Sequence, residues 1–192
     1  MTKLIAFDLE GILVEEEFLV ELARTVDKEQ EVRKITEDGI KGRINWEEGL
    51  KKRIELLKGM DYETIEKLSR KFTINKNAID IIQTAKSNEF KTAIISGGFK
   101  IFAENIMKKL GIDYLIANDF IFEKGKLKGY KLLVNNNKGY WLRKFAEDCK
   151  ADFTIAIGDG ENDIEMLKAA DLGILSRGKD LHVFKDAIKN YK

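Results

Sequence analysis

Two carboxylates, Asp159 and Asp163, lie in a glycine-containing turn near the C-terminal end of the chain. The apolar run of residues 153–157 precedes the turn, and Gly158 and Gly160 flank the first aspartate. Carboxylates gathered after a strand repel one another unless a cation lies between them, and oxygen ligands suit magnesium. An acidic turn that caps the following helix has the same composition. The segment alone therefore leaves a magnesium site and an ordinary capped turn equally open.

The composition indicates a globular protein and argues against several classes of partner. The chain has 192 residues, 44% of them hydrophobic and 35% charged, with a formal net charge of +1. A charge this close to zero gives no reason to expect a nucleic acid or a membrane surface as partner. The single cysteine, Cys149, excludes an internal disulfide bond. We therefore expect a cytoplasmic protein without a membrane or nucleic-acid partner, and leave a monomer and a homodimer equally open.

Five short apolar runs have the length of buried strands, and after residue 76 they alternate with helical patterns. They are residues 3–7, 91–95, 114–118, 153–157 and 172–175. This alternation predicts a doubly wound, Rossmann-like α/β fold with a mainly parallel sheet. Residues 120–134 instead predict a hairpin that turns at residues 123–126. Ligands of such sheets bind beyond the carboxyl ends of the strands, so the residues that follow each strand are the candidates for a site.

Between the first strand and residue 76 the sequence shows helical patterns alone. Apolar side chains recur there at helical spacing, as they do at Trp46, Leu50, Ile54 and Leu57. About sixty residues of helix directly after one strand predict an inserted helical module. We place this cap at residues 15–73 and the Rossmann-like core at residues 1–14 and 74–192.

Polar segments follow the predicted strands or precede a helix, and their order along the chain is specific. They are residues 8–12 (DLEGI), 96–99 (SGGF), 137–139 (NKG) and 158–163 (GDGEND). With the helical insertion after the first segment, this order resembles the haloacid dehalogenase superfamily, in its phosphoserine-phosphatase-like branch with a C1-type helical cap. The resemblance covers nearly the whole chain. It implies Mg²⁺-dependent hydrolysis of a small phosphorylated metabolite, with phosphoserine as the leading substrate.

Asp8 has the chemistry of the nucleophile that phosphoryl transfer needs. Its carboxylate can attack phosphorus in line and form an aspartyl-phosphate. The resemblance implies that Asp8 and Asp159 bind Mg²⁺ together with the backbone carbonyl of Glu10, and that Asp163 lies close by. Mg²⁺ prefers about six oxygen ligands, few of them from the protein. These four residues form the expected metal site.

Lys138, Ser96 and Gly97 can supply the charge and the hydrogen bonds that a phosphate group needs. Lys138 would neutralise phosphate and keep Asp8 ionised. Ser96 and the amide of Gly97, expected at a helix N-terminus, can donate to phosphate oxygens, and the resemblance adds Asn162 to the phosphate ligands. Taken singly, a surface lysine or an N-capping serine is the simpler explanation of each residue. The prediction therefore depends on their joint order.

Glu10 is the main departure from the family pattern. The family's first motif is Asp-x-Asp-x-Thr/Val, whereas residues 8–12 read Asp-Leu-Glu-Gly-Ile. The resemblance implies that the second carboxylate protonates the leaving group and then activates water, and glutamate has the same acid chemistry as aspartate. Its extra methylene moves the carboxyl by about 1 Å, which can cost about 10²-fold in rate. We therefore assign Glu10 as the acid/base and expect metal binding to survive the exchange.

The predicted cap carries three residues that match the branch. Glu17 matches a carboxylate for the substrate amine, and Arg53 an arginine for the substrate carboxylate, which a guanidinium binds bidentately. Trp46 matches an aromatic residue that lines the substrate pocket. Each residue also has an explanation that needs no function. Glu17 lies in a run of three glutamates, Arg53 lies in a basic helix, and Trp46 lies on an apolar helix face.

The functional prediction is a Mg²⁺-dependent phosphomonoester hydrolase that works through an aspartyl-phosphate. Because Glu10 replaces the usual aspartate, two alternatives stay open. One is a phosphatase or phosphotransferase of the same mechanism with another substrate. The other is a weakly active or inactive relative that binds phosphate.

Overall fold

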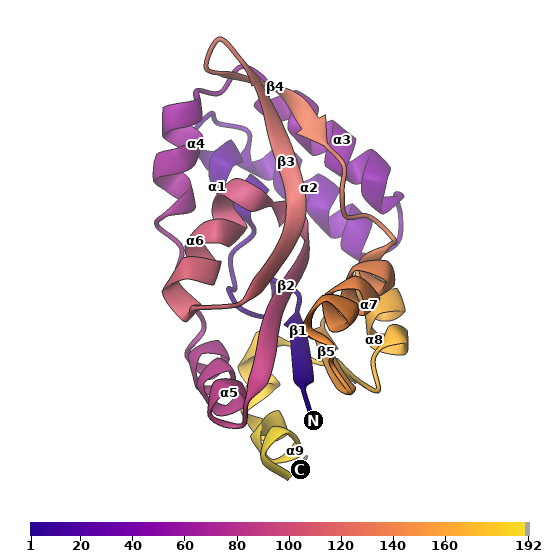
Figure 1. Ribbon diagram of the computed structural model, residues 1–192. Helices are drawn as coiled ribbons and strands as arrows, with labels where there is room; N and C mark the ends of the chain where they lie inside the picture. The colour runs from indigo at the N-terminus through magenta and orange to yellow at the C-terminus, as the bar shows by residue number, and fades with distance from the viewer. Residues whose placement is uncertain (191–192) are drawn as a thin grey trace.

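The computed structural model describes residues 1–190 and contains a six-stranded sheet in the order β4-β3-β2-β1-β5-β6 (Figure 1). The strands are β1 Lys3–Phe7, β2 Phe90–Phe99, β3 Tyr114–Glu123, β4 Lys126–Lys131, β5 Phe153–Gly158 and β6 Leu172–Leu175. All neighbouring pairs are parallel except β3 and β4, which form an antiparallel hairpin. The carboxyl ends of β1, β2 and β5 therefore meet at one edge, where the polar segments of the sequence lie.

Helices cover both faces of the sheet, as the prediction of a doubly wound α/β fold requires. Alternate residues of β1 separate the two cores: Ile5 and Phe7 face one layer, and Leu4 and Ala6 the other. The first layer includes α5 Lys76–Ser87 and α6 Lys100–Leu110, and the second α7 Lys138–Cys149 and α8 Ile164–Ala169. After β6 the chain forms the 3₁₀ helix η2 Gly178–Phe184 and then α9 Lys185–Asn190, and both pack against α5.

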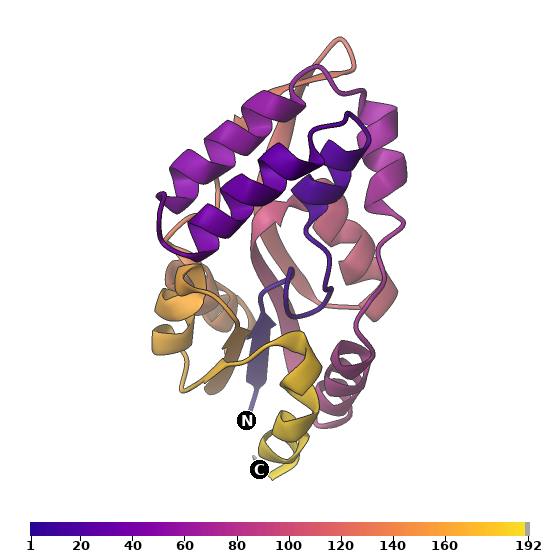
Figure 2. The same ribbon diagram turned by 180° about the vertical axis from the view of Figure 1, so that it is seen from behind.

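Four helices lie beyond the carboxyl ends of the strands, within the segment expected to be a cap (Figures 1 and 2). They are α1 Phe18–Arg24, α2 Glu29–Ile40, α3 Trp46–Leu57 and α4 Tyr62–Ser69. Asn45 starts α3 by accepting hydrogen bonds from the amides of Glu47 and Glu48, so Trp46 is the first residue of that helix. The chain enters and leaves the helical segment side by side, through a bridge between Val14 and Ile74.

The β3–β4 hairpin pairs with the loop between α3 and α4. Gly59 N donates to Leu127 O at 2.8 Å, and Leu127 N to Met60 O at 2.9 Å. Tyr62 N donates to Gly125 O at 2.8 Å. The four helices are therefore attached to the sheet through this hairpin as well as through their two linkers.

One expectation about local structure is wrong. Ser96 and Gly97 do not start a helix, because β2 continues to Phe99 and α6 begins at Lys100. Ser96 Oγ accepts a hydrogen bond from Gly98 N at 2.9 Å, and the register between β2 and β3 shifts between Ile95 and Phe99. This bond holds residues 96–98 in an irregular extended turn. Over residues 1–190, no helix is both long and apolar enough to span a membrane.

Candidate active site

A buried lysine joins two carboxylates at the carboxyl edge of the sheet. Lys138, the first residue of α7, donates to Asp8 Oδ1 at 2.8 Å and to Asp163 Oδ1 at 2.5 Å. Lys138 and Asp163 have no exposed surface, and Asp8 is 6% exposed. Asp8 directly follows β1, and its amide donates to Ile157 O of β5, so β1 and β5 together fix its position.

The pKa values reflect this crowding of charge. Burial raises the pKa of Asp8 to about 7, and Asp163 adds to the rise while Lys138 opposes it. Burial alone would lower the pKa of Lys138, but the two carboxylates outweigh it and the pKa lies above its ordinary value. Lys138 is therefore a fixed cation, and a second cation beside Asp8 would favour the ionised carboxylate.

Asp159 completes a cluster that can hold such a cation. One carboxylate oxygen from each of Asp8, Asp159 and Asp163 lies within 4.8 Å of the other two. Asp159 is the exposed member, and burial followed by the charge of Asp163 raises its pKa. Asp163 Oδ2 accepts from the amides of Asp159 and Gly160, which fixes the turn. An all-oxygen set of this kind suits a hard divalent cation.

The strand-end segment Ser96–Gly97 faces the same site from β2. Ser96 is 1% exposed and lines the cavity that Asp8 also lines. The indole of Trp46 lies against Gly97 so closely that a Cβ on this glycine would lie 2.7 Å from Cζ2 of the ring. Trp46 therefore covers the expected phosphate-binding segment from α3 rather than packing only within the helical segment.

Asn118 is a buried polar residue that the sequence analysis did not identify. Its Nδ2 donates to Gly97 O at 2.8 Å and to Val134 O at 3.2 Å, and its Oδ1 accepts from the amides of Leu133 and Val134. Asn118 thus fixes the peptide of Gly97 from the neighbouring strand β3. An asparagine at the end of the apolar run 114–118 was the available signal.

Glu10 lies between the sheet and the helical segment. Its Oε1 accepts a hydrogen bond of 2.7 Å from the amide of Phe18, the first residue of α1. Burial raises the pKa of Glu10 to about 8, with a further rise from Glu17 and a smaller one from Asp8. The raised pKa favours the protonated form of the Glu10 side chain. Its reach to α1 uses the extra methylene that distinguishes glutamate from aspartate.

Glu17 and Arg53 line the same cavity from the helical segment. Arg53 Nε donates to Gly49 O and its Nη1 to Thr36 Oγ1, both at 3.3 Å. Burial lowers the pKa of Arg53, opposed by Glu17 and Glu10, and burial raises the pKa of Glu17, opposed mainly by Arg53. Arg53 and Glu17 therefore act on each other electrostatically, and no direct ion pair between them is seen among the described residues.

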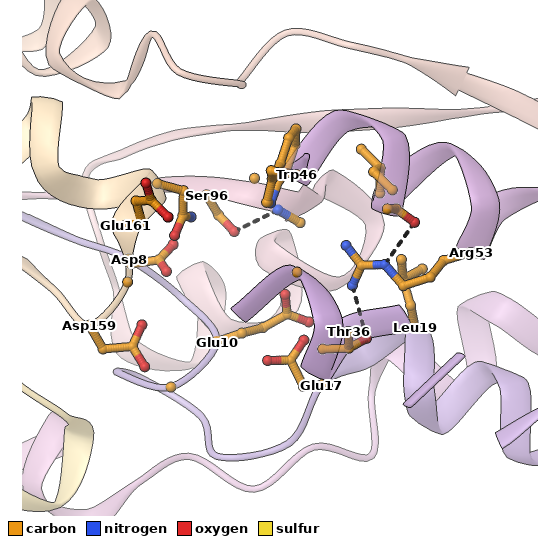
Figure 3. A pocket seen from close by; sticks show the side chains of 18 of the residues that line it. Asp8, Glu10, Glu17, Leu19, Thr36, Trp46, Arg53, Ser96, Asp159 and Glu161 are labelled. Carbon is orange, nitrogen blue, oxygen red and sulfur yellow. Dashed lines mark hydrogen bonds between the residues drawn. The ribbon is translucent and has the colours of Figure 1, made fainter. Parts of the chain in front are cut away.

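The cavity that unites these groups has a volume of about 1140 Å³. Figure 3 shows the order of the labelled side chains along it: Asp8, Asp159 and Glu161 at one end, Glu10 and Glu17 in the middle, and Thr36 and Arg53 at the other. Asn162 lines the cavity from the turn after β5, whereas Lys138 and Asp163 lie behind its wall. The structure thus places every residue predicted for the site in or directly behind the wall of this one cavity. The carboxylates at the Asp8 end would match a cation, beside which an anionic group could bind, and the charges of Glu17 and Arg53 would match a zwitterionic group.

The chain is similar to known proteins in both sequence and structure. The family model for haloacid dehalogenase-like hydrolases matches residues 5–168. A curated phosphoserine phosphatase of Methanocaldococcus jannaschii is 41% identical over 90% of this chain and 84% of its own length.

Two solved structures share the fold across nearly the whole chain. One is described as a phospho-aspartyl intermediate analogue of phosphoserine phosphatase, with a TM-score of 0.87 and 36% identity over 97% of this chain and 98% of its own. The other, a substrate-bound phosphoserine phosphatase complex, has the same TM-score and coverage at 35% identity.

Proposed function

This chain belongs to the haloacid dehalogenase-like hydrolases, and from that membership we propose that it hydrolyses phosphoserine through an aspartyl-phosphate intermediate. The observation that carries the proposal is the pairing of Asp8 with the buried cation of Lys138 at the end of the cavity. A buried, positioned carboxylate beside a fixed cation suits attack on an anionic phosphoryl group. The similarity to a phosphoserine phosphatase, to its substrate-bound complex and to its phospho-aspartyl intermediate analogue supports phosphoserine as the substrate and an aspartyl-phosphate as the intermediate.

In the first step, a carboxylate oxygen of Asp8 forms a bond to phosphorus while the bond from phosphorus to the serine oxygen breaks. Lys138 keeps Asp8 ionised and offsets the charge of the phosphoryl group. Ser96 and the amide of Gly97 donate to phosphoryl oxygens, although from an extended turn instead of a helix N-terminus. Asn162 is the further phosphate ligand of the proposal.

Glu10 is the proposed acid/base. Its raised pKa of about 8 keeps it protonated near neutral pH, so that it can donate a proton to the departing serine oxygen. In the second step, the resulting carboxylate takes a proton from water as the water oxygen attacks phosphorus. Phosphate leaves and the carboxylate of Asp8 is restored.

Mg²⁺ is the proposed cofactor, held by Asp8 and Asp159 with the backbone carbonyl of Glu10, and with Asp163 beside them. The cluster of three carboxylates within 4.8 Å and the raised pKa of Asp8 support a site for a divalent cation. When bound, Mg²⁺ supplies positive charge that stabilises the phosphoryl oxygens in the transition state.

Substrate recognition is assigned to the helical segment. Arg53 binds the carboxylate of phosphoserine and Glu17 its amine, while Trp46 covers the phosphoryl end. In this assignment residues 15–73 form a cap that sets specificity, and residues 1–14 and 74–192 form the core that performs the chemistry.

Phosphate release from phosphoserine by the purified protein tests the proposal. We expect release with Mg²⁺, loss of release in EDTA, and a decrease of about 10⁴-fold or more in kcat for Asp8→Asn. Asp148→Asn, an exposed aspartate on α7, is the matched control and should keep the parent rate. Binding of phosphoserine without any phosphate release, even at high protein concentration, would instead identify a phosphate-binding relative.

A larger phosphomonoester is the second candidate substrate. The cavity volume of about 1140 Å³ leaves room beyond a molecule as small as phosphoserine, and the cavity continues to Gly39 of α2. A panel of phosphoesters ranked by kcat/KM separates the two candidates. A larger ester that exceeds phosphoserine by tenfold or more would replace it as the proposed substrate.

A further inference from the structure

Residues 176–179, here called the C-terminal strap, connect the end of β5, the loop that follows β1 and the first turn of α5. After β6 the chain crosses beside the loop that follows β1, before it turns down into α9 (Figure 2). Ser176 N donates to Gly158 O at 2.9 Å, at the end of β5. Gly178 N donates to Gly11 O at 2.8 Å, and Lys179 O accepts from Asn77 Nδ2 at 2.7 Å.

Gly178 is the residue of the strap that packs directly against the loop that follows β1. It is buried, and a Cβ at this position would overlap the backbone oxygen of Ile12 and the side-chain amide of Asn75. It would also lie 3.1 Å from Gly11 O. A backbone oxygen cannot rotate away as a flexible side chain can, so any larger residue would push the strap and the loop apart.

The loop that Gly178 contacts carries both groups that would react with substrate. It begins at Asp8, includes Glu10, and turns back through hydrogen bonds from Leu13 N and Val14 N to Leu9 O. These bonds hold the turn together internally, and the bond from Asp8 N to Ile157 O fixes its first residue on β5, but none of them sets the position of residues 10–12 relative to the end of β5. The contact of Gly178 with Gly11 and Ile12, with the bond of Ser176 to Gly158, joins the two.

We propose that Gly178 is a positioning residue for phosphoryl transfer: by packing against Gly11 and Ile12 it holds the Asp8–Glu10 turn in register with the Asp159 turn. The reaction affected is the one under "Proposed function", on which this inference rests. Because a displacement of about 1 Å in a reacting group can cost about 10²-fold in rate, even a small movement of this loop would lower kcat. Substrate binding by Arg53, at the other end of the cavity, would change little.

The test compares Gly178→Ala with Gly129→Ala. Gly129 lies in β4, where an added Cβ meets nothing within 4 Å, so its variant controls for the exchange itself. We expect kcat for phosphoserine to fall by about 10- to 100-fold in Gly178→Ala while KM changes by less than about threefold. We also expect faster amide hydrogen exchange in peptides that cover residues 9–14, with no change in peptides from α7. Gly129→Ala should match the parent in all three measurements.

Asn77→Ala provides a second variant that adds no bulk. It removes the bond from Asn77 Nδ2 to Lys179 O, and a smaller decrease in kcat with faster exchange in residues 9–14 is expected. This variant decides the question if Gly178→Ala does not fold. Parent-like kcat and exchange in the folded variants, or a rise of KM alone, would overturn the inference. An inactive parent would refute the proposed function instead, and the exchange measurement would still decide whether Gly178 orders the loop.

Discussion

The two ends of the cavity are built in opposite ways. At the phosphoryl end, Lys138 is fully buried and donates to two carboxylates at 2.8 and 2.5 Å. At the other end, the half-buried Arg53 donates only to Gly49 O and Thr36 Oγ1, both at 3.3 Å, among the described residues. The first set of charges is paired before any ligand arrives, whereas the second retains a guanidinium group that an incoming carboxylate can bind.

This difference separates chemistry from specificity. The paired end rests on β1, β5 and α7, whose positions the sheet determines, and it can stabilise any phosphoryl group. The open end rests on α1, α2 and α3, which meet the sheet through linkers and through the β3–β4 hairpin. Glu10 stands between the two, with its carboxyl bonded to the first amide of α1. Four predictions test whether the two ends are separable, in order of expected effect.

Lys138→Met should have the largest effect, because it leaves Asp8 and Asp163 as uncompensated buried carboxylates. Removing one partner of a buried pair costs about 3–5 kcal/mol, so the free energy of unfolding of the metal-free protein should fall by that amount and activity should be lost. Denaturant titration measures the first and phosphate release the second. The exposed Lys144→Met on the same helix should change the free energy of unfolding by less than about 0.5 kcal/mol. Equal effects of both variants would contradict the role of the buried cation.

Arg53→Met should affect one substrate and leave another unchanged. Loss of charge-assisted hydrogen bonds should raise KM for phosphoserine by about 10- to 100-fold. The kcat/KM for p-nitrophenyl phosphate, which has no carboxylate, should stay within about threefold of the parent. Lys52→Met, an exposed neighbour on α3, is the control for a charge change on this helix. A parallel decrease for both substrates would show that Arg53 acts on the phosphoryl end as well.

Glu10→Gln should flatten the pH dependence of stability. The pKa of Glu10 is raised from 4.5 to about 8 on folding, so the folded protein binds this proton more tightly than the unfolded chain. The stabilisation that this proton gives the folded protein is complete below pH 4.5, and it is lost as the pH rises from 4.5 through about 8. Denaturant unfolding of the metal-free parent and variant, measured between pH 5 and pH 9, should show a smaller loss of stability in Glu10→Gln. Identical pH profiles would mean that Glu10 is not desolvated.

Arg177→Gln should have the smallest effect, a gain of about two- to fivefold in affinity for Mg²⁺. Arg177 is exposed, lines the cavity and lowers the pKa of Asp159 through its charge. Removing a screened surface cation near a cation site changes binding by less than about 1 kcal/mol. Calorimetric titration with Mg²⁺ measures the change directly, with Lys179→Gln as the neighbouring exposed control. Weaker binding in Arg177→Gln would show that this residue supports the metal site.

The parallel sheet and the position of the site were predictable because β1, β2 and β5 are each followed by a polar segment. Asp8 follows β1 by one residue and Asp159 follows β5 by one residue, so a parallel sheet brings them together whatever the details of packing. The expected helix start at Ser96 was wrong, because β2 continues to Phe99 and α6 begins only at Lys100. The role of Asn118 was also missed, because its bonds reach backbone groups of two other segments, at Gly97 and at residues 133–134.

The sequence alone predicted the parallel α/β architecture, the gathering of Asp8, Asp159 and Asp163 after strands, and the lysine that faces them. Local apolar patterns and strand-end motifs contain that information, since each depends on residues close together in the chain. Only the tertiary structure decided that Trp46 covers Gly97, that Glu10 reaches α1, and that Gly178 packs against Gly11. The last two contacts use backbone amides or carbonyls, which almost every residue has, and the contacts of Trp46 with Gly97 and of Gly178 with Gly11 join segments that are far apart in the chain. No residue type marks such contacts in advance.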